Sequence, residues 1–476
     1  MPPPIQVAVI GAGISGLSCA HRLRQFGLSV IVLECHAHAG GVIGTIERNG
    51  FRFESGPQSF LGTRPAMELI RALGIEGEVL QANPRAPRYV FKQGRLCAVP
   101  MSPPALLASS LLSLSSRYRV LSEPFRRSSP SVVDESVAAF VRRKFGQEIL
   151  EYLVAPFVSG VYAGDPEVLS LKSAFPSLDE WQRRHGSIIR GAMNARKAEG
   201  GPRPGLCSFR TGMSTLTGSL ARSLGSTFIP GACVSAVEKS SSGSGFTVRF
   251  TRGLPHHDAP HEELHVPAVV VAAPAYVAGH ILSAVSPAIS KSLFSITYAP
   301  VAVVALGYKR AQVANSLLGF GVLIPRKEGF RTLGTVWNSS LFPNCAPPDS
   351  VLLTSFVGGA TDPQIIEQDE SAISEIVEGE IGRILEISGP PVEKQIWRHE
   401  MGLPQYNLGH SYILEGVKEE LKKFAGLFMA GNYWLGPSIG NCVDASNAVA
   451  DSVRAYLSGA PAAADSAPQS HIPAAN

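Results

Sequence analysis

The stretch IQVAVIGAGISG, residues 5–16, decides the fold of this chain. Its first half, residues 5–10, is apolar and β-branched and predicts a strand, while residues 14–27 keep the apolar spacing of a helix. Residues 28–34 form a second, continuously apolar run, as a parallel strand buried on both faces requires. Strand, helix and strand in this order predict a βαβ unit, the nucleus of a doubly wound dinucleotide-binding sheet.

The glycines of the first turn match the spacing GxGxxG, and each has a separate purpose. Gly11 permits the tight turn, Gly13 lets the backbone approach a pyrophosphate, and Gly16 permits close packing of helix on strand. Glu34 ends the second strand, where its carboxylate can accept hydrogen bonds from a ribose. The expected cofactor contacts of this unit are Gly11, Ala12, Gly13, Ile14, Ser15, Gly16 and Glu34.

Composition narrows the class of protein. The chain has 476 residues, enough for two or three lobes, and its net charge of +4 is too close to balance for a nucleic-acid binder. The 7 cysteines are scattered without a CxxC pair, which argues against a disulfide framework or a zinc site and favours a reducing compartment. We expect no secretion signal and no membrane span, since the longest apolar stretch, residues 105–114, is too short.

Residues 84–204 have a different composition, rich in serine, arginine and proline. Within them residues 134–154 keep a helical apolar period, and Asp134 stands where it could cap that helix. This block is predicted to be an inserted helical lobe. Its arginines are interleaved with apolar residues, so an anionic lipid surface is an expected neighbour.

Strand patterns resume after this lobe, at residues 228–237, 246–252, 266–273, 298–308 and 332–356, followed by an amphipathic helix at residues 367–387. A histidine-rich run at residues 256–265 looks like a metal box by composition, but it lies between two strand patterns and contains Pro260. We expect a solvated hairpin loop there and no metal site. The end, residues 459–476, is expected to be a disordered tail.

Two further segments resemble the amine oxidase/phytoene desaturase group of flavoproteins: GGVIGT at residues 40–45 and FRFESGP at residues 51–57. The resemblance implies that the dinucleotide is FAD, and no second GxGxxG for a nicotinamide cofactor is visible. The FAD contacts that it implies are Gly41, Val42, Gly56, Pro57, Gln58, Ser59 and Val234.

The far end of the chain supports FAD binding. FMAGNY at residues 428–433 predicts a strand that breaks at glycine, and PSIGNCVD at residues 437–444 opens a helix. Backbone N–H groups at such a helix start can bind the flavin carbonyls and stabilise a reduced ring. The expected contacts here are Gly431, Asn432, Pro437, Ser438 and Ile439.

Beyond the flavin segments, the chain resembles the protoporphyrinogen oxidase family of heme biosynthesis over nearly its whole length. The motifs that carry the resemblance are GVYAGD at residues 160–165, GFGVLIP at residues 319–325 and PQYNLGH at residues 404–410. The resemblance implies an α/β and α+β fold: a discontinuous Rossmann-like FAD domain of the p-hydroxybenzoate hydroxylase type, a mixed-sheet substrate domain and a helical membrane-binding insert.

The expected division follows from that resemblance. We expect an FAD domain from residues 1–70, 206–285 and 401–458, a substrate domain from residues 71–84 and 286–400, and a membrane-binding domain at residues 85–205.

The resemblance also implies a substrate pocket. Arg88 matches the arginine that binds a propionate of the substrate, a role that suits its fork of N–H donors. The remaining residues implied to line the pocket are Gly160, Ala163, Gly164, Phe320, Leu323 and Trp337. No acid–base pair stands out, so no catalytic side chain is assigned.

The reaction that the resemblance implies is oxidation of protoporphyrinogen IX to protoporphyrin IX in three two-electron rounds, with oxygen as acceptor and H2O2 as by-product. Coproporphyrinogen III oxidation, an amine oxidase or carotenoid desaturase reaction, and a non-catalytic FAD-bound membrane protein stay open as alternatives. The expected location is cytoplasmic with peripheral attachment to a membrane. A homodimer and transient contact with a neighbouring heme-pathway enzyme are compatible with the resemblance.

Overall fold

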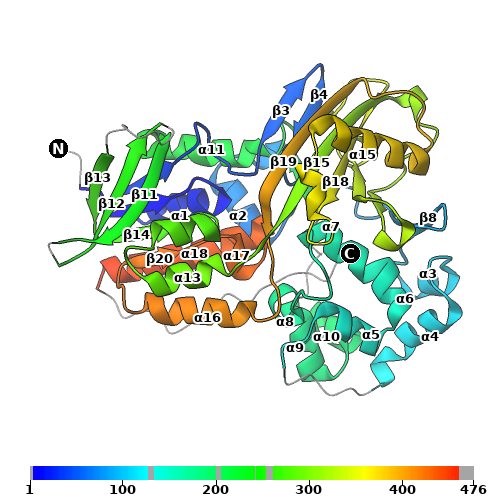
Figure 1. Cartoon of the computed structure of the whole chain (residues 1–476), viewed down its shortest axis with the longest axis horizontal. Coiled ribbons are helices and arrows are strands. Elements are labelled where there is room, and N and C mark those ends of the chain that lie inside the picture. Colours follow the sequence, from blue (N-terminus) through cyan, green and yellow to red (C-terminus); the bar gives the residue numbers. More distant parts are fainter. Residues whose placement is uncertain (1–3, 127–132, 200–204, 242, 254–260, 460–476) are drawn as a thin grey trace.

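A computed structural model describes residues 4–126, 133–199, 205–241, 243–253 and 261–459. Figure 1 shows three groups of elements: a helix-covered sheet at the left, a second sheet at the upper right, and a bundle of short helices at the lower right. The three groups interleave along the chain, because distant segments contribute to the first two.

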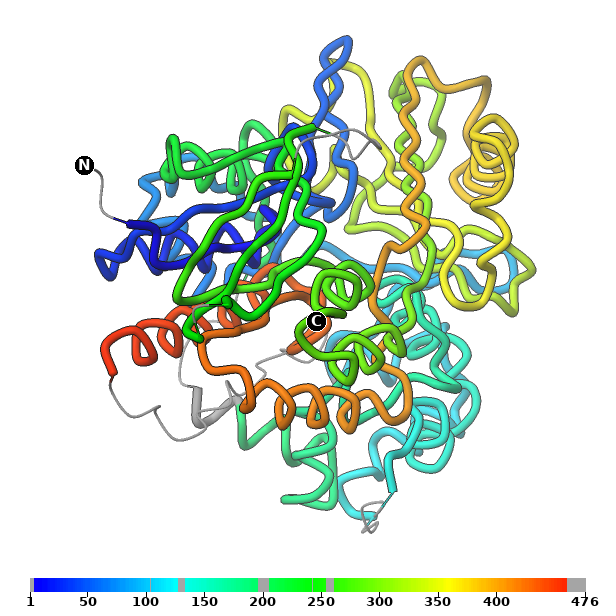
Figure 2. Tube along the Cα trace, turned by 60° about the vertical axis from the view of Figure 1, so that its left-hand side comes forward, coloured from blue at the N-terminus to red at the C-terminus, as the bar shows by residue number. Residues whose placement is uncertain are grey.

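The first sheet has five parallel strands in the order β10-β2-β1-β14-β20. Their bounds are Phe228–Pro230, Val30–Glu34, Val7–Ile10, Ala268–Val271 and Leu427–Met429. One face buries the apolar sides of α1 (Ile14–Gln25), α2 (Arg64–Ala72), α11 (Ser214–Leu224) and α18 (Ile439–Leu457). Figure 2 shows the N-terminal blue segment close to the red C-terminal helix, as expected since α1 packs on α18. The predicted βαβ unit is confirmed, and it is completed by segments from the middle and end of the chain.

The other face of this sheet carries an antiparallel sheet and three helices. The sheet consists of β11 (Ala232–Lys239), β12 (Phe246–Arg252) and β13 (His261–Val266), and the helices are α12 (Ala275–Ile281), α13 (Pro287–Phe294) and α16 (His410–Leu421). Of the histidine-rich run, only residues 261–265 lie within the described part. They form most of β13 and pair with β12, so the loop expected at these residues was wrong. The layers cover both faces of the parallel sheet, as its apolar strands require.

The second sheet has seven strands in the order β19-β15-β18-β17-β16-β7-β8. Their bounds are Glu393–Pro404, Tyr298–Lys309, Ser350–Gly358, Thr332–Trp337, Gly321–Leu323, Arg88–Lys92 and Arg95–Ala98. Helix α15 (Glu370–Leu385), capped by Asp369, packs on one face. The hairpin β7–β8 belongs to this sheet, and the first helix after it begins at Pro103. Hydrogen bonds to β16, more than 200 residues away in sequence, hold β7 in place.

Cross-strand register fixes which side chains share a face of this sheet. Tyr89, Val322 and Trp337 pack with α15, in one core cluster. Val90 and Leu323 pack instead with the helical lobe. Since side chains alternate along a strand, Arg88 shares the face of Val90. We call this second face the Arg88 face.

The helical lobe contains α3 to α10. Their bounds are Pro103–Ala108, Leu114–Ser122, Val137–Lys144, Gln147–Ile149, Ala155–Tyr162, Leu171–Ala174, Pro176–His185 and Ile188–Glu199, with a π-helical turn at Leu150–Val154. Gly146, at φ +95°, interrupts the single helix expected at residues 134–154. Asp134 does not cap it: Ser136 does, while Asp134 accepts hydrogen bonds from the Ser170 hydroxyl and from the Gly409 N–H.

Short elements connect these parts. The two-stranded sheet is β3 (Thr45–Arg48) with β4 (Phe51–Glu54), and a three-stranded sheet joins β5 (Phe60–Leu61), β9 (Leu206–Phe209) and β6 (Val79–Gln81). Single-turn helices α14 (Asn338–Leu341) and α17 (Asn432–Leu435) follow β17 and β20.

Two expectations about the chain as a whole can be compared with the structure. The sequence argued against a disulfide framework, yet Cys35 and Cys233 form one disulfide. Spacing along the chain could not reveal it, because 198 residues separate the two positions. Over the described residues, no helix combines the length and the apolar character that crossing a bilayer demands. Residues 460–476, expected to be a tail, lie outside the described part.

Candidate active site

The turn between β1 and α1 has the geometry of a pyrophosphate site. Gly11 has φ +100° and its N–H donates to Leu33 O at 2.8 Å, so the chain turns sharply over the sheet. A Cβ on Gly13 would meet no atom within 4 Å, whereas one on Gly16 would come within 1.9 Å of Gly11 O. Open space at Gly13 and close packing at Gly16 are the two properties that the motif predicts.

Glu34 lies beside this turn and is buried. One carboxylate oxygen accepts the Ala12 N–H at 2.7 Å, and the other accepts the His36 N–H at 2.9 Å. Two backbone bonds fix the carboxylate's position while leaving acceptor capacity for a ribose, since a carboxylate has about four lone-pair sites. Val234 follows Cys233, and the Cys35–Cys233 disulfide holds its strand next to Glu34.

A second glycine turn faces the first one. Gly13 and Gly40 form an isolated bridge, and a Cβ on Gly41 would lie 3.5 Å from the Cα of Gly13. Further along, a Cβ on Gly56 would lie 2.4 Å from Val42 O, so the segment 56–59 packs against the same turn. The structure thus brings together the expected set Gly41, Val42, Gly56, Pro57, Gln58 and Ser59.

The segment after β20 brings a second helix N-terminus to this place. Ser438 caps α18 by accepting the Asn441 N–H at 3.1 Å. The Ser15 hydroxyl, in the first turn of α1, hydrogen-bonds the Cys442 thiol in the first turn of α18. The positive ends of α1 and α18 are therefore adjacent, which favours an anionic ligand between them.

Two side chains that hydrogen-bond this segment were not predicted. The Tyr406 hydroxyl donates to Asn432 O, and the His410 Nε2–H donates to Tyr433 O at 2.8 Å. A carbonyl only accepts, so Nε2 carries a proton, and burial lowers the pKa of His410. Both residues belong to PQYNLGH, which identified a family but no role for its side chains. They fix two consecutive carbonyls of the expected flavin-binding loop.

These observations fit FAD. The open space at Gly13, the fixed carboxylate of Glu34 and the two adjacent helix N-termini suit a ribose and a pyrophosphate. Across the described part of the chain, no group of three or more histidine, cysteine, aspartate or glutamate side chains could hold a metal ion.

Arg88, the expected carboxylate ligand, is the first residue of β7 in the seven-stranded sheet, where it lies opposite Gly321 of β16. Its guanidinium is half-buried and lies 5.2 Å from the ring centroid of Phe320. Burial lowers the pKa of Arg88, and the guanidinium keeps its charge at neutral pH. Among the described residues, no carboxylate forms an ion pair with it, so its charge is available to a ligand.

The helical lobe meets the Arg88 face at Leu323. A Cβ on Gly160 would lie 2.7 Å from a methyl of Leu323, so α7 approaches the sheet closely at this residue. Ala163 ends α7, and its carbonyl accepts the Ala360 N–H at 2.7 Å. Gly164 lies beside the Gln405 amide. Gly160, Ala163, Gly164 and Leu323 thus lie at one junction.

Trp337 is not at this junction. It is 1% exposed and packs with Tyr89 at 5.4 Å between ring centroids, on the α15 side of the sheet. The neighbouring Val336 takes the opposite face and, like Phe320, packs against the cluster of Ala82, Leu341 and Phe342. A shift of one residue in a strand exchanges the two faces, and the motif alone did not settle the strand's orientation.

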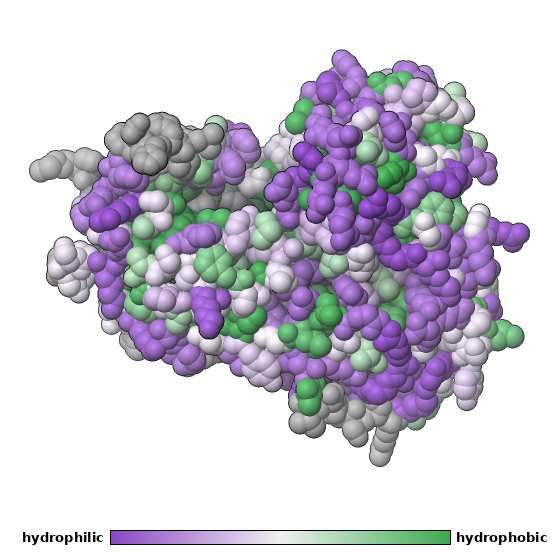
Figure 3. All heavy atoms as spheres, viewed as in Figure 1, coloured by the Kyte–Doolittle hydropathy of each residue, from purple (hydrophilic) through white to green (hydrophobic). Residues whose placement is uncertain are grey.

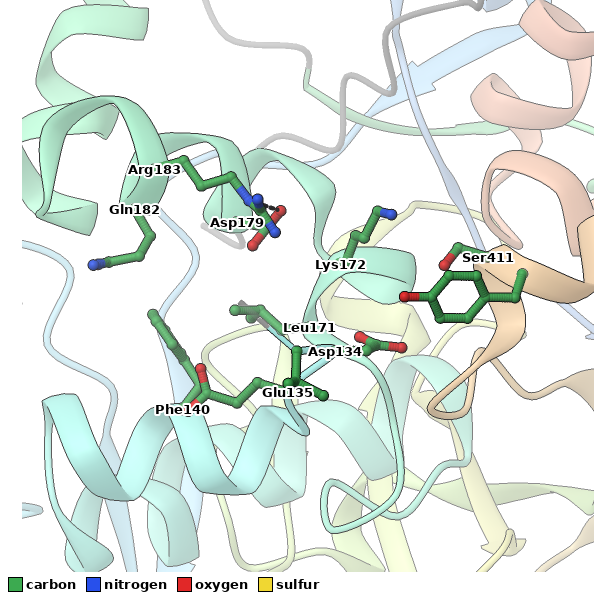
Figure 4. Close-up of a pocket in the computed structure, with 11 residues that line it drawn as sticks. Asp134, Glu135, Phe140, Leu171, Lys172, Asp179, Gln182, Arg183 and Ser411 are labelled. Atoms are coloured by element: carbon green, nitrogen blue, oxygen red, sulfur yellow. Dashed lines mark hydrogen bonds and ion pairs between the residues drawn. The ribbon is translucent and has the colours of Figure 1, made fainter. Parts of the chain in front are cut away.

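Two cavities adjoin the helical lobe. Figure 4 shows one between α5, α9 and α16, where Lys172 and the Asp179–Arg183 pair point toward it; at about 50 Å³ it has room for little more than a water molecule. The other, about 870 Å³, is lined by charged pairs that join the lobe to the second sheet, including Lys92 with Glu148 and Lys327 with Glu151. It is a charged, open junction at the outer end of β7.

Comparison with known proteins agrees with this geometry. The flavin containing amine oxidoreductase family matches residues 14–454. The chain is 34% identical to the chloroplastic protoporphyrinogen oxidase of Nicotiana tabacum, over 95% of this chain and 86% of that protein. It is 29% identical to the coproporphyrinogen III oxidase of Bacillus subtilis, over 95% and 98%.

Solved structures show the same fold. A proposed protoporphyrinogen oxidase from Exiguobacterium sp. superposes with a TM-score of 0.80 at 21% identity, covering 96% of this chain and 99% of the other. Cyclohexylamine oxidase from Brevibacterium oxydans superposes with a TM-score of 0.68 at 18% identity, covering 96% and 100%. The chain therefore belongs to the flavin containing amine oxidoreductase family, among the relatives of the protoporphyrinogen oxidases.

Proposed function

We propose that this FAD-dependent oxidase converts protoporphyrinogen IX to protoporphyrin IX. The observation that carries the proposal is Arg88, a half-buried guanidinium that forms no ion pair within the described residues and lies on the sheet face that meets the helical lobe. A propionate is the group of a porphyrinogen that a guanidinium fork binds best. The similarity to the tobacco enzyme supports the same substrate.

The chain's own residues have positioning roles in this reaction. Arg88 binds a propionate, while Leu323 and Val336 offer apolar side chains to the macrocycle. Close contact of Gly160 with Leu323 helps to exclude water from the junction. When bound, FAD would supply the two-electron acceptor for each round, with oxygen as the final acceptor that gives H2O2. Three rounds remove six electrons and six hydrogens from the substrate, matched by three molecules of H2O2.

Coproporphyrinogen III is a second candidate, because the Bacillus subtilis relative is named for it. That substrate has more carboxylates than protoporphyrinogen. The higher identity to the tobacco protoporphyrinogen oxidase favours protoporphyrinogen as the substrate.

Anaerobic mixing tests the proposal. Protoporphyrinogen should bleach the flavin absorbance in single turnover, and coproporphyrinogen should do so more slowly. If neither bleaches the flavin, the proposed function is wrong. Faster reduction by coproporphyrinogen would make coproporphyrinogen the preferred substrate.

The division into FAD, substrate and membrane-binding parts also stays a proposal. The best support for membrane attachment is an apolar surface on α3, α4 and the turn after it, where the most exposed side chains are Leu107 (60%), Leu114 (78%), Tyr118 (73%) and Phe125 (87%). Arg117 donates to the carbonyls of Leu107 and Leu112, which are neutral groups and do not cancel its positive charge. Such a surface suits anionic lipid headgroups. Figure 3 shows apolar side chains in scattered groups on a mostly hydrophilic face.

Flotation with phosphatidylserine vesicles tests this attachment. The protein should float with them, and the double variant Leu114→Glu/Phe125→Glu should not. Leu318→Glu, at a residue 71% exposed outside the helical lobe, is the matched control. Equal flotation of all three proteins would contradict the assignment of this surface.

A further inference from the structure

A buried pair of amide side chains joins the expected flavin segment to the end of β17. Asn338 Nδ2 donates to Gln58 Oε1 at 2.8 Å, and the two side chains belong to residues only 5% and 7% exposed. Gln58 Nε2 donates in turn to Gly56 O at 2.8 Å and to Glu54 O at 3.3 Å. A strand of the second sheet is thereby tied to the FAD domain.

These bonds decide which end of each amide faces which neighbour. Backbone carbonyls only accept, so the Gln58 nitrogen must face Gly56 and Glu54, and its oxygen must face Asn338. Asn338 must therefore present its nitrogen to Gln58, which leaves its oxygen, Oδ1, directed elsewhere. Oδ1 is buried, and nothing within the described ranges donates to it.

Such an acceptor is costly to leave without a donor, because water has been removed from it. Its place argues for a ligand. Asn338 directly follows β17, whose Gly334 and Val336 lie on the Arg88 face, and its partner Gln58 belongs to the segment that packs on the glycine turn. The oxygen therefore lies where the substrate sheet and the flavin segment meet.

We propose that Asn338 Oδ1 accepts a hydrogen bond from a pyrrole N–H of the bound porphyrinogen. This inference rests on the proposed function. The pyrroles are the N–H donors of that substrate, whereas its carboxylates only accept when ionised. Arg88 then binds the periphery of the macrocycle and Asn338 its centre. Two contacts at different distances from the rim set the rotation of the ring relative to the flavin segment.

A second property follows from the chemistry of the substrate. Oxidation to the porphyrin removes half of the pyrrole N–H donors, and the nitrogens that lose them present lone pairs instead. A fixed acceptor is complementary to the reduced ring and less so to the oxidised ring. Asn338 thus discriminates substrate from product.

The test compares Asn338→Ala with the wild-type holoenzyme. We expect KM for protoporphyrinogen to rise about tenfold, which is about 1.4 kcal/mol, because one hydrogen bond to the substrate is lost. The inhibition constant for protoporphyrin should change less than about twofold. The FAD dissociation constant, from flavin fluorescence, should be unchanged. Asn338→Leu keeps the side-chain volume without the acceptor and should give the same selective rise.

Thr251→Val is the matched control, because the Thr251 hydroxyl is also buried without a partner among the described residues but lies on β12. It should leave both constants unchanged. Weaker FAD binding with unchanged KM in Asn338→Ala would assign the oxygen to the cofactor and overturn the proposal. So would an unchanged KM, or equal weakening of substrate and product. Failure of the wild-type protein to oxidise protoporphyrinogen would instead overturn the proposed function, before any variant is made.

Discussion

Replacement of Arg88 by alanine should weaken substrate binding strongly while sparing the cofactor. The guanidinium is half-buried, lies beside Phe320 and has no carboxylate partner among the described residues. Its loss removes the proposed partner of a propionate without exposing an unpaired charge elsewhere in the protein. The fold should therefore tolerate the change.

The expected magnitude follows from the kind of bond. Hydrogen bonds to charged groups contribute about 1.5–3 kcal/mol, which corresponds to a rise in KM of roughly ten- to a hundred-fold. Solvent reaches part of the guanidinium, so the lower half of this range is expected. Arg88→Lys keeps the charge but loses the planar fork, and it should recover only part of the affinity.

Steady-state formation of porphyrin fluorescence measures KM and kcat, and flavin absorbance measures FAD content. Arg95→Ala is the matched control, since Arg95 is an exposed arginine on the adjacent strand β8. We expect it to leave KM unchanged. An unchanged KM in Arg88→Ala, or an equal rise in Arg95→Ala, would refute the assignment of Arg88 to the substrate.

Three further predictions concern the cofactor and the stability of the fold. Gly13→Ala should weaken FAD binding about tenfold or more, because its methyl group would occupy the open approach to the turn. Fluorescence titration measures the FAD dissociation constant. Gly77→Ala, at a glycine equally free of neighbours, should leave that constant unchanged. Glu123→Ala should lower the free energy of unfolding in urea by about 3–5 kcal/mol, because it leaves the buried ammonium of Lys144 without its carboxylate; a loss below about 1 kcal/mol would show that water replaces the pair. Burial raises the pKa of Glu54 from 4.5 to about 7. Its protonated form therefore stabilises the fold fully below pH 4.5, and this contribution is lost as pH rises through 7. The free energy of unfolding should fall by at most about 1.4 kcal/mol per pH unit in this window. Glu54→Gln should flatten this part of the stability–pH curve, and an unaltered slope would exclude Glu54 as its cause.

Local patterns predicted those parts of the molecule that local forces determine. The tight turn at Gly11 follows from backbone freedom at a single residue, and it is present. The amphipathic helix expected at residues 367–387 spans Glu370–Leu385.

The features that local patterns did not reveal depend on distant partners. β7 pairs with β16, Cys35 is bonded to Cys233, and Asp134 receives the Gly409 N–H instead of capping its own helix. None of these contacts leaves a signature within a short window of sequence. The face occupied by Trp337 depends likewise on strand register, which a motif does not contain.

Parts of the site were equally hidden. Tyr406, His410 and Asn338 act through single polar atoms that meet residues elsewhere in the chain, Asn432, Tyr433 and Gln58. Motifs indicated the segments in which these residues occur, but only the folded arrangement shows which atoms have partners.

The central claim is that this flavoprotein oxidises a porphyrinogen completely at the Arg88 face. Its most direct test is the stoichiometry of aerobic turnover by the purified holoenzyme, with porphyrin followed by absorbance and H2O2 by a coupled peroxidase. The account predicts three molecules of H2O2 for each protoporphyrin formed, at a rate that depends on Arg88. Absence of porphyrin above the rate of spontaneous oxidation, with the flavin still oxidised under anaerobic conditions, would contradict it.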